Sequence, residues 1–338
     1  MVQQQHGGNV TAFAKEIGCK VSEVIDLSSN INFVKPNIDI DFNALNISAY
    51  PNYEKLENAI AKLYEIQIDE LELFNGATTA IYSLFRILNL THCTLYAPLY
   101  LEYEKAAKIY NYELHQVNRF NNMEKEMQEE SLVVFVNPST PDGKFYDIDK
   151  LMQIWMDKNC TIFVDESFLD FTPFASVSKY LSKYDKLYIL KSMTKFYSAA
   201  GIRIGALLSN PKNIEYIKSY EPLWKLSEFD SHYLLSALKD KTFKKNAQEH
   251  NAINRKQLLQ VLKSSNHIHS IYPSDSNFLM VKLQEINAQD FQEQLLPFKI
   301  MIRNCSNFTF LDDSYVRIAI KESKNLDILK KALLYNCV

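Results

Sequence analysis

Two stretches decide the fold: residues 160–168 read Cys-Thr-Ile-Phe-Val-Asp-Glu-Ser-Phe, and residues 187–195 read Leu-Tyr-Ile-Leu-Lys-Ser-Met-Thr-Lys. Each begins with an apolar run of strand length and ends in polar residues, a pattern typical of buried parallel strands. Open α/β sheets place their ligands at the carboxyl ends of such strands. We therefore expect Asp165 and Lys195 to lie at one sheet edge.

The alternation extends to either side of these stretches. From about residue 70 to 210, short β-branched and aromatic runs alternate with longer amphipathic segments, which predicts a mostly parallel sheet with helical crossovers. The expected strands are Leu71–Phe74, Thr94–Ala97, Leu132–Val136, Thr161–Val164, Leu187–Leu190 and Ile204–Leu208. Helical spacing of apolar residues appears at Ala80–Leu88, Glu102–Tyr110 and Ile148–Lys158.

The remainder predicts further units around this α/β domain. With 338 residues the chain exceeds the size at which single cores usually stop growing, roughly 250–300 residues. We expect an N-terminal arm at 1–45, a large domain at 46–230 and a smaller α+β domain at 231–338. The elements expected outside the large sheet are helices at Val10–Ile17, Glu228–Ser264 and Ala288–Leu295, and strands at Asn277–Lys282, Lys299–Arg303 and Tyr315–Ala319.

Composition limits the classes of function. A net charge of −3 gives no long-range field that would attract nucleic acid or an anionic membrane, and no apolar run approaches the ~18 residues of a membrane span. The five cysteines are scattered, without the close pairs typical of zinc sites. We expect a cytoplasmic protein with reduced thiols, no metal, and a small anionic ligand.

Asp165 and Lys195 each have an ordinary and a chemical interpretation. Asp165 could simply cap the segment that follows it, or its carboxylate could pair with a protonated ring nitrogen of a cofactor. A lysine in a loop is usually solvated. Lys195, however, is accompanied by Ser192, Thr194 and Arg203, with Gly201 and Gly205 nearby, and such a cluster can hold a phosphate beside an amine.

A second anion site is expected at residues 75–79, Asn-Gly-Ala-Thr-Thr, between a predicted strand and a predicted helix. Backbone amides at a helix N-terminus attract anions, although Thr-rich capping turns bind nothing in most proteins. Together with Ser192, Thr194 and Arg203, this turn predicts a two-sided phosphate site.

These segments resemble the signature of fold-type I pyridoxal-phosphate enzymes of the aminotransferase class I/II group. Within that group the chain is most similar to L-threonine-O-3-phosphate decarboxylases, with histidinol-phosphate aminotransferases as the nearest relatives. The similarity runs from end to end. It is carried by residues 6–9 (His-Gly-Gly-Asn), 26–32, 50–53 (Tyr-Pro-Asn-Tyr), 165–171, 192–195, 201–205 and 302–307.

The resemblance implies a role for each of a set of residues. Lys195 would hold pyridoxal 5′-phosphate as a Schiff base, Asp165 would pair with its ring nitrogen, and Tyr100 would stack on the ring. The cofactor phosphate would be held by Ala77, Thr78, Ser192, Thr194 and Arg203, and by Tyr50 from the other subunit of a homodimer. The substrate carboxylate would bind Arg317, and the substrate phosphate His6, Asn30 and Arg303.

Several of these residues could instead have an ordinary structural role. Tyr100 could be ordinary core packing, and His6 a polar residue at a terminus. Arg303 and Arg317 lie on apolar strands, where a guanidinium needs an anionic partner, and a structural carboxylate could serve as well as a substrate.

One departure from the family pattern concerns Thr140. Residues 137–143 read Asn-Pro-Ser-Thr-Pro-Asp-Gly, which places a threonine where the family has an asparagine that contacts the cofactor's phenolic oxygen. A single hydroxyl replaces an amide there, so the way the ring oxygen and the substrate carboxylate are held is in question.

The leading functional hypothesis is decarboxylation of a small phosphorylated amino acid, L-threonine O-3-phosphate or L-serine O-phosphate. A histidinol-phosphate-type aminotransferase is the alternative within the same fold. A catalytically silent pyridoxal-phosphate-binding protein is the alternative from another class, motivated by Thr140.

Overall fold

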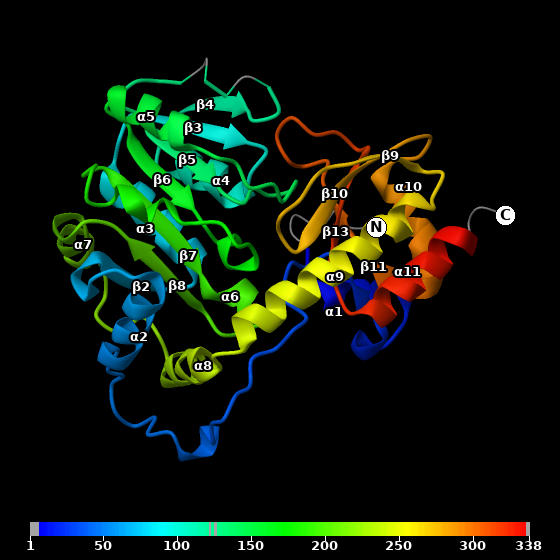
Figure 1. Cartoon of the computed structure of the whole chain (residues 1–338), viewed down its shortest axis with the longest axis horizontal. Coiled ribbons are helices and arrows are strands. Elements are labelled where there is room, and N and C mark those ends of the chain that lie inside the picture. The colour runs from blue at the N-terminus through cyan, green and yellow to red at the C-terminus, as the bar shows by residue number, and fades with distance from the viewer. Residues whose placement is uncertain (1–6, 122, 125–126, 336–338) are drawn as a thin grey trace.

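A seven-stranded sheet forms the centre of the larger part of the molecule (Figure 1). The structure is a computed structural model that describes residues 7–121, 123–124 and 127–335. The strand order is β2-β8-β7-β6-β5-β3-β4, and all strands are parallel except β8, which runs antiparallel to both neighbours. The strands are β2 (Leu71–Asn75), β3 (His92–Ala97), β4 (Glu113–Asn118), β5 (Leu132–Val136), β6 (Thr161–Asp165), β7 (Leu187–Ser192) and β8 (Ile204–Leu208).

Helices cover both faces of this sheet, and the strand residues alternate between two cores. Ile162 and Val164 of β6 face a cluster that includes residues of α2, α5 and α8, whereas Phe163 faces a cluster with α3 and α4. Since side chains of a strand alternate, Asp165 points to the same face as Phe163. The helices of this part are α2 (Glu54–Tyr64), α3 (Ala77–Leu88), α4 (Leu101–Ile109), α5 (Asp149–Asp157), α6 (Met193–Phe196), α7 (Pro211–Lys218) and α8 (Glu228–Lys239).

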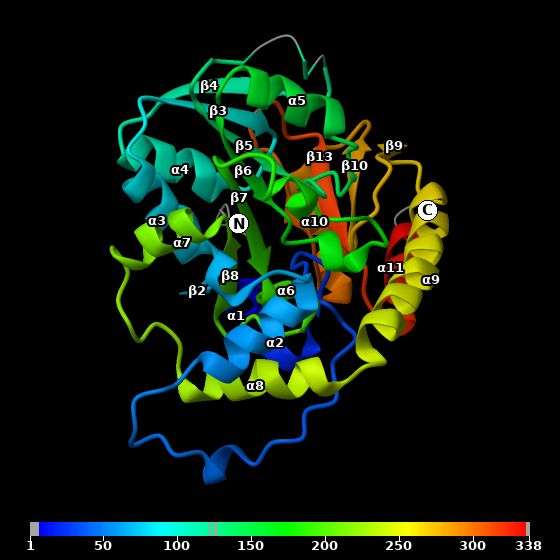
Figure 2. The same ribbon diagram turned by 60° about the vertical axis from the view of Figure 1, so that its left-hand side comes forward.

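The smaller part, on the right of Figure 1, has its own antiparallel sheet and core. Its strands follow the order β12-β13-β10-β9, and β1 adds a short parallel pair with β11. The strands are β1 (Ile25–Asp26), β9 (Ile268–Ile271), β10 (Phe278–Leu283), β11 (Ile300–Met301), β12 (Arg303–Asn304) and β13 (Tyr315–Ala319). The helices are α1 (Val10–Ile17), α9 (Phe243–Lys263), α10 (Ala288–Leu295) and α11 (Ser323–Tyr335). Figure 2 shows α9 and α11 side by side along its outer face.

The predicted fold class is confirmed, with corrections to individual elements. The helix expected at Glu228–Ser264 is two helices, because Asp240 accepts hydrogen bonds from the backbone N–H groups of Thr242 and Phe243 and starts α9 there. The strand expected at Lys299–Arg303 is likewise two short strands, which pair with different partners. The sequence prediction did not include α2, α6, α7, α11, β1, β4 or β9.

The expected division at 230/231 falls inside α8, whose Leu234 packs in a core of the large sheet. We propose that the large domain extends through α8 to the start of α9, and that residues 7–26, which end in the strand β1 paired with β11, belong with the smaller domain.

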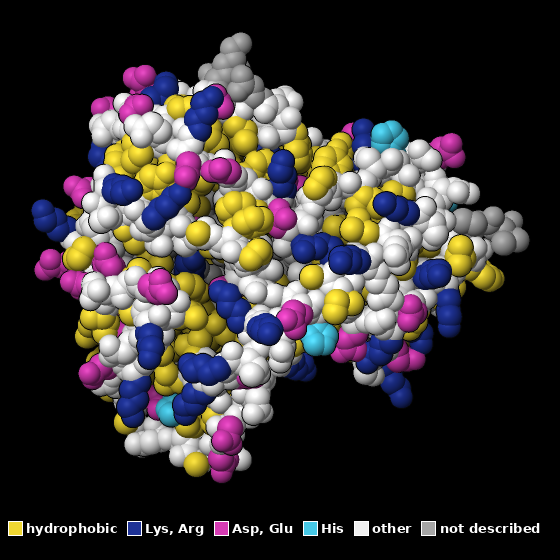
Figure 3. All heavy atoms as spheres, viewed as in Figure 1, with side chains coloured by type: hydrophobic (Ala, Val, Ile, Leu, Met, Phe, Trp, Pro, Cys, Tyr) yellow, Lys and Arg dark blue, Asp and Glu magenta, His cyan; other side chains and the backbone are white. Residues whose placement is uncertain are grey.

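Acidic and basic side chains are interspersed over the face shown in Figure 3. In the described part of the chain, none of the helices is long and apolar enough to cross a membrane.

Candidate active site

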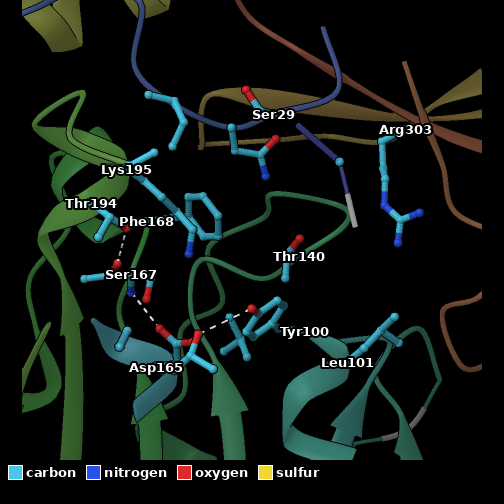
Figure 4. A pocket seen from close by; sticks show the side chains of 18 of the residues that line it. Ser29, Tyr100, Leu101, Thr140, Asp165, Ser167, Phe168, Thr194, Lys195 and Arg303 are labelled. Carbon is cyan, nitrogen blue, oxygen red and sulfur yellow. Dashed lines mark hydrogen bonds between the residues drawn. The ribbon is translucent and has the colours of Figure 1, made fainter. Parts of the chain in front are cut away.

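A cavity of about 320 Å³ lies where β5, β6 and β7 end, between the large sheet and the strands β12 and β13 of the smaller part. Figure 4 shows Lys195 and Phe168 on one side of it, Asp165 at its floor, and Thr140 and Arg303 across from them. The structure brings twelve of the predicted site residues to this cavity: Asn30, Ala77, Thr78, Tyr100, Thr140, Asp165, Ser192, Thr194, Lys195, Arg203, Arg303 and Arg317.

Asp165 is held by two hydrogen bonds from its own surroundings. Its Oδ1 accepts from the backbone N–H of Ser167 at 2.8 Å, and its Oδ2 accepts from the hydroxyl of Tyr103 at 2.8 Å. Its side chain is buried and faces the cavity. Asp165 therefore does cap the turn that follows it, and each of its oxygens keeps a lone pair for a ligand.

Lys195 lies on the short helix α6, directly after β7. Its Nζ is 4.5 Å from the ring centroid of Phe168 and 6.0 Å from that of Tyr100, so the amine lies among aromatic rings. Burial lowers the pKa of Lys195, and Arg317 and Arg203 lower it further, while the Asp165 carboxylate opposes them. A lysine in this setting is closer to the neutral, nucleophilic form than a solvated one.

Arg203 and the N-terminus of α3 form a cradle for an anion. Gly76 has φ +79°, and a Cβ added there would lie 2.5 Å from Nη2 of Arg203, so the guanidinium approaches the turn because residue 76 has no side chain. A Cβ on Gly205 would similarly lie 2.5 Å from the backbone nitrogen of Ala77. Ser192 and Thr194 add hydroxyls, which lie 2.9 Å apart. The N–H groups of a helix N-terminus, hydroxyls and a guanidinium together suit a phosphate.

Tyr100 spans the gap between this cradle and Asp165. Its hydroxyl is 3.4 Å from Oγ1 of Thr78, and burial raises its pKa, so the phenol stays protonated near neutral pH. The ring forms part of the cavity wall rather than of the deep core.

Arg317 is buried, and its hydrogen bonds go to uncharged oxygens. Its Nη1 donates to Oγ1 of Thr140 at 3.0 Å and its Nη2 to the backbone oxygen of Ser28 at 3.1 Å, whereas Nε has no partner among the described residues. Burial lowers the pKa of Arg317 to about 10. The departure at Thr140 thus has a structural counterpart, because the threonine hydroxyl orients the guanidinium.

Arg303 lies beside Arg317. The two are directly paired residues on the antiparallel strands β12 and β13, so their side chains leave the sheet on the same face. Arg303 donates to the backbone oxygen of Asn304 and to Oδ1 of Asn307, and its guanidinium lies 5.2 Å from the ring centroid of Phe308. Burial lowers its pKa as well.

The family model for aminotransferase class I and II matches residues 22–333. The chain belongs to this family.

Three curated relatives illustrate its position within the family. It is 26% identical over 340 residues to the adenosylcobalamin biosynthesis bifunctional protein CobDQ of Leptospira interrogans, covering 94% of this chain and 39% of that protein, so the chain spans well under half of that relative. It is 27% identical to the "Putative threonine-phosphate decarboxylase" of Caldanaerobacter subterraneus, covering 98% of this chain and 94% of that protein. It is 28% identical to a histidinol-phosphate aminotransferase of Flavobacterium psychrophilum, covering 92% of this chain and 93% of that protein.

Solved structures share the fold throughout. Histidinol-phosphate aminotransferase from Clostridium acetobutylicum is 28% identical with a TM-score of 0.84, covering 93% of this chain and 100% of that one. L-threonine-O-3-phosphate decarboxylase from Porphyromonas gingivalis is 20% identical with a TM-score of 0.82, covering 92% and 98%. At that identity the likeness shows the fold alone.

The cofactor of the enzyme is pyridoxal phosphate. The solved structure of histidinol-phosphate aminotransferase from Sinorhizobium meliloti is a complex with this cofactor. That structure matches with a TM-score of 0.84 and 18% identity, covering 98% of this chain and 95% of that one. The cavity fits this group. It offers an amine of lowered pKa, a fixed carboxylate, an aromatic wall and an anion cradle in which a Cβ would clash at residue 76.

Two predicted site residues are not placed in the cavity. Tyr50 is exposed and stacks on Trp224, with ring centroids 4.0 Å apart, and does not line the cavity. His6 lies outside the described residues, although Gly7, the next residue, reaches the cavity wall.

Sequence reasoning missed several residues that the structure places at the site, among them Tyr103, Ser28, Ser167 and Phe168. Ser167 and Phe168 belong to the quoted stretch after β6, so their position next to Asp165 offered a signal. Ser28 lies in the segment 26–32 that carries the family resemblance, but its contact with Arg317 needed the structure. Tyr103 offered no signal, since it acts through a contact with a residue far away in the sequence.

Proposed function

We propose that the protein catalyses the pyridoxal-phosphate-dependent decarboxylation of a small phosphorylated amino acid, L-threonine O-3-phosphate or L-serine O-phosphate. The observation that carries this proposal is the adjacent pair of buried arginines, Arg303 and Arg317. Support also comes from the relatives named for threonine-phosphate decarboxylation and adenosylcobalamin biosynthesis.

The charges of the cavity favour a substrate with two anionic groups. Its described lining includes three guanidinium groups, those of Arg203, Arg303 and Arg317, and the amine of Lys195, against one carboxylate, that of Asp165. The cofactor phosphate matches Arg203, which leaves two guanidinium groups on one face of the small sheet. Burial lowers the pKa of both guanidinium groups, and the charge of Arg303 lowers the pKa of Arg317 further. Two anions bound nearby would offset both the loss of hydration and the repulsion between the two charges.

The spacing of the two arginines favours a short substrate. Directly opposed residues of an antiparallel pair have Cα atoms roughly 4.5–5.5 Å apart. A carboxylate and a phosphate joined through two carbons and an oxygen, as in phosphothreonine and phosphoserine, suit that spacing. Histidinol phosphate offers the phosphate but no carboxylate.

Different residues of the cavity would bind the two anionic groups of the substrate. Arg317, oriented by Thr140 and Ser28, would bind the substrate carboxylate, while Arg303 and Asn30 would bind its phosphate. Oδ1 of Asn30 is buried and has no partner among the described residues. When bound, the cofactor supplies an electron sink for the electron pair that the departing carboxylate leaves behind.

Asp165 would stabilise the protonated ring nitrogen of the cofactor with its carboxylate. The amine of Lys195, displaced by the substrate amine, would deliver a proton from Nζ to the carbon that has lost the carboxylate. Because burial favours the neutral form of this amine, it can also accept the proton of the incoming substrate amine.

The alternative function is amino transfer from histidinol phosphate or a related phosphorylated amine. It is favoured by relatives of similar identity, and an amino acceptor with two carboxylates would also engage both arginines. The arginine pair therefore indicates a dianionic ligand, and the products must decide between the two reactions.

We further propose that the chain acts as a cytoplasmic homodimer in which Tyr50 of one subunit reaches the cofactor phosphate of the other. Tyr50, Leu223 and Trp224 are more than half exposed and would be covered in such a dimer. The described cysteines Cys19, Cys93, Cys160 and Cys305 are free thiols. Light scattering at micromolar concentration should give twice the monomer mass, and Tyr50→Phe should weaken cofactor binding without dissociating the dimer.

The test of the reaction is a panel of three substrates, phosphothreonine, phosphoserine and histidinol phosphate, each with and without 2-oxoglutarate. We expect mass spectrometry to detect aminopropanol phosphate or ethanolamine phosphate without the oxo acid. Products that require 2-oxoglutarate would instead establish the aminotransferase. Lys195→Ala is the control. A cofactor absorbance band that depends on Lys195, without turnover of any panel member by the wild type, would indicate the silent binding protein.

A further inference from the structure

Tyr103 is a phenol with no solvent exposure directly beneath the candidate active site. It lies in the first turn of α4, three residues after Tyr100, and its hydroxyl donates to Oδ2 of Asp165 at 2.8 Å. It does not line the cavity, so any effect on the reaction has to pass through another residue.

The hydrogen bond from Tyr103 fixes the orientation of the carboxylate. Asp165 receives one bond on each oxygen, from the backbone of Ser167 and from the phenol of Tyr103, and two bonds on opposite oxygens define the plane of the carboxyl group. Burial and the Asp165 charge raise the pKa of Tyr103 well above its ordinary value, so the phenol remains a donor throughout the working pH range.

The ring of Tyr103 is equally constrained. It meets the ring of Tyr100 edge to face, with centroids 6.4 Å apart and an interplanar angle of 84°, and it meets Phe163 of β6 at 5.7 Å and 76°. One buried side chain therefore contacts both the carboxylate expected at the ring nitrogen and the tyrosine expected at the ring face.

We propose that Tyr103 is a positioning residue that holds Asp165 in the orientation in which its carboxylate can pair with the ring nitrogen of the cofactor. A hydrogen bond weakens steeply when its geometry departs from linear. Without the phenol the carboxylate can turn, its pairing with the ring nitrogen weakens, and the ring becomes a poorer electron sink. The proposal rests on the role given to Asp165 under the proposed function, but it holds for decarboxylation and amino transfer alike.

A purely structural role for the phenol is the alternative, and Tyr112 provides the matched control. Tyr112 is also a buried tyrosine that packs against Phe85, and its hydroxyl donates to the backbone oxygen of Phe85 at 2.8 Å. Tyr112 is not among the described residues that line the cavity, and its hydroxyl bonds to the backbone of Phe85 and Leu90 rather than to Asp165. Tyr103→Phe and Tyr112→Phe each remove one buried hydroxyl, but only the first is expected to affect Asp165.

The experiment compares Y103F, Y112F and wild type, each converted to apoenzyme and titrated with pyridoxal phosphate labelled with ¹⁵N in the ring. We expect Y103F to raise the Kd of the cofactor by about tenfold, because the charge-assisted hydrogen bond between the reoriented Asp165 carboxylate and the ring nitrogen is weakened, and to move the ring ¹⁵N shift toward that of a neutral pyridine. Y112F should leave both within about twofold of wild type, because sites that share no partner affect each other by no more than about 0.5 kcal/mol.

Repeating Y103F in a variant that lacks the Asp165 carboxylate makes the test independent of overall stability. In Asp165→Asn the hydroxyl of Tyr103 has lost its charged partner, so adding Y103F should change the Kd of the cofactor no further. Equal cofactor Kd and ¹⁵N shift in Y103F and wild type would overturn the proposal, and so would an undiminished effect of Y103F in the D165N background. Both readouts are taken without substrate, so they do not depend on which reaction the enzyme catalyses.

Discussion

Replacing Arg317 by lysine tests the assignment of the substrate carboxylate. The substitution keeps the positive charge but removes the planar fork that can grip a carboxylate with two parallel hydrogen bonds. In the structure two of the five guanidinium donors are used by Thr140 and Ser28, and three remain. Lysine has three donors in all, so at least one charge-assisted bond to the substrate is lost. Such a bond contributes about 1.5–3 kcal/mol, or about a 10- to 150-fold change in affinity.

The assay compares two ligands that differ in the carboxylate. For phosphothreonine, R317K should lower kcat/KM by that factor, whereas the inhibition constant of the product aminopropanol phosphate, which has no carboxylate, should stay within about threefold of wild type. Arg303→Lys is the matched variant on the neighbouring strand, and it should weaken both ligands because both carry the phosphate. If R317K weakens the product as much as the substrate, or affects neither, Arg317 does not bind the substrate carboxylate.

Three further outcomes follow from the site and the core. Gly76→Ala should weaken the binding of pyridoxal phosphate by at least about tenfold, because its Cβ would displace Arg203. Gly18→Ala is the control: residue 18 has φ +71° and open space around it, so this variant should lose only ~1 kcal/mol of stability. Equal cofactor affinities of the two variants would show that Gly76 and Arg203 do not form an anion site. Burial lowers the pKa of Lys195 below its ordinary value of 10.5, and only the neutral amine can react with the cofactor. The rate at which apoenzyme captures pyridoxal phosphate, measured by stopped flow, should therefore fall as pH is lowered through a midpoint below 10.5. A midpoint at or above 10.5 would contradict this. Trp155→Ala, at a position with no solvent exposure, should cost ~3–5 kcal/mol in urea unfolding, and a loss below ~1 kcal/mol would show that the core is not packed as described.

The strands of the large sheet could be predicted because helices cover both of its faces. A strand buried on both sides is apolar at every position, and Leu132–Val136 and Ile204–Leu208 were predicted to the residue. The edge strand β4 was missed for the same reason, since its residues Glu113–Asn118 are only partly buried and mostly polar. The long helix was split at Asp240, whose carboxylate accepts hydrogen bonds from the backbone N–H groups of Thr242 and Phe243, a local signal that the helical periodicity on either side concealed.

The site could be predicted where its residues follow strands in the sequence, and not where they meet through packing. Asp165 ends one recognisable apolar run and Lys195 follows shortly after another, so their shared edge follows from parallel topology. The pairing of Arg303 with Arg317 depends on the register of β12 and β13, which no local pattern specifies. Thr140 was visible only as a departure from a family pattern, and its contact with Arg317 needed the structure. Tyr103 was not predicted, because its partner lies 62 residues further along the chain.

We propose above all that this cavity removes the carboxylate of a phosphorylated amino acid. The most direct measurement is the release of labelled carbon dioxide from carboxyl-labelled L-threonine O-3-phosphate and L-serine O-phosphate by the purified holoenzyme, without any oxo acid. We expect carbon dioxide to be released in a one-to-one ratio with the amino-alcohol phosphate, and this release to be lost in Lys195→Ala. No release from either compound, with 2-oxoglutarate-dependent amino transfer from histidinol phosphate in its place, would contradict it.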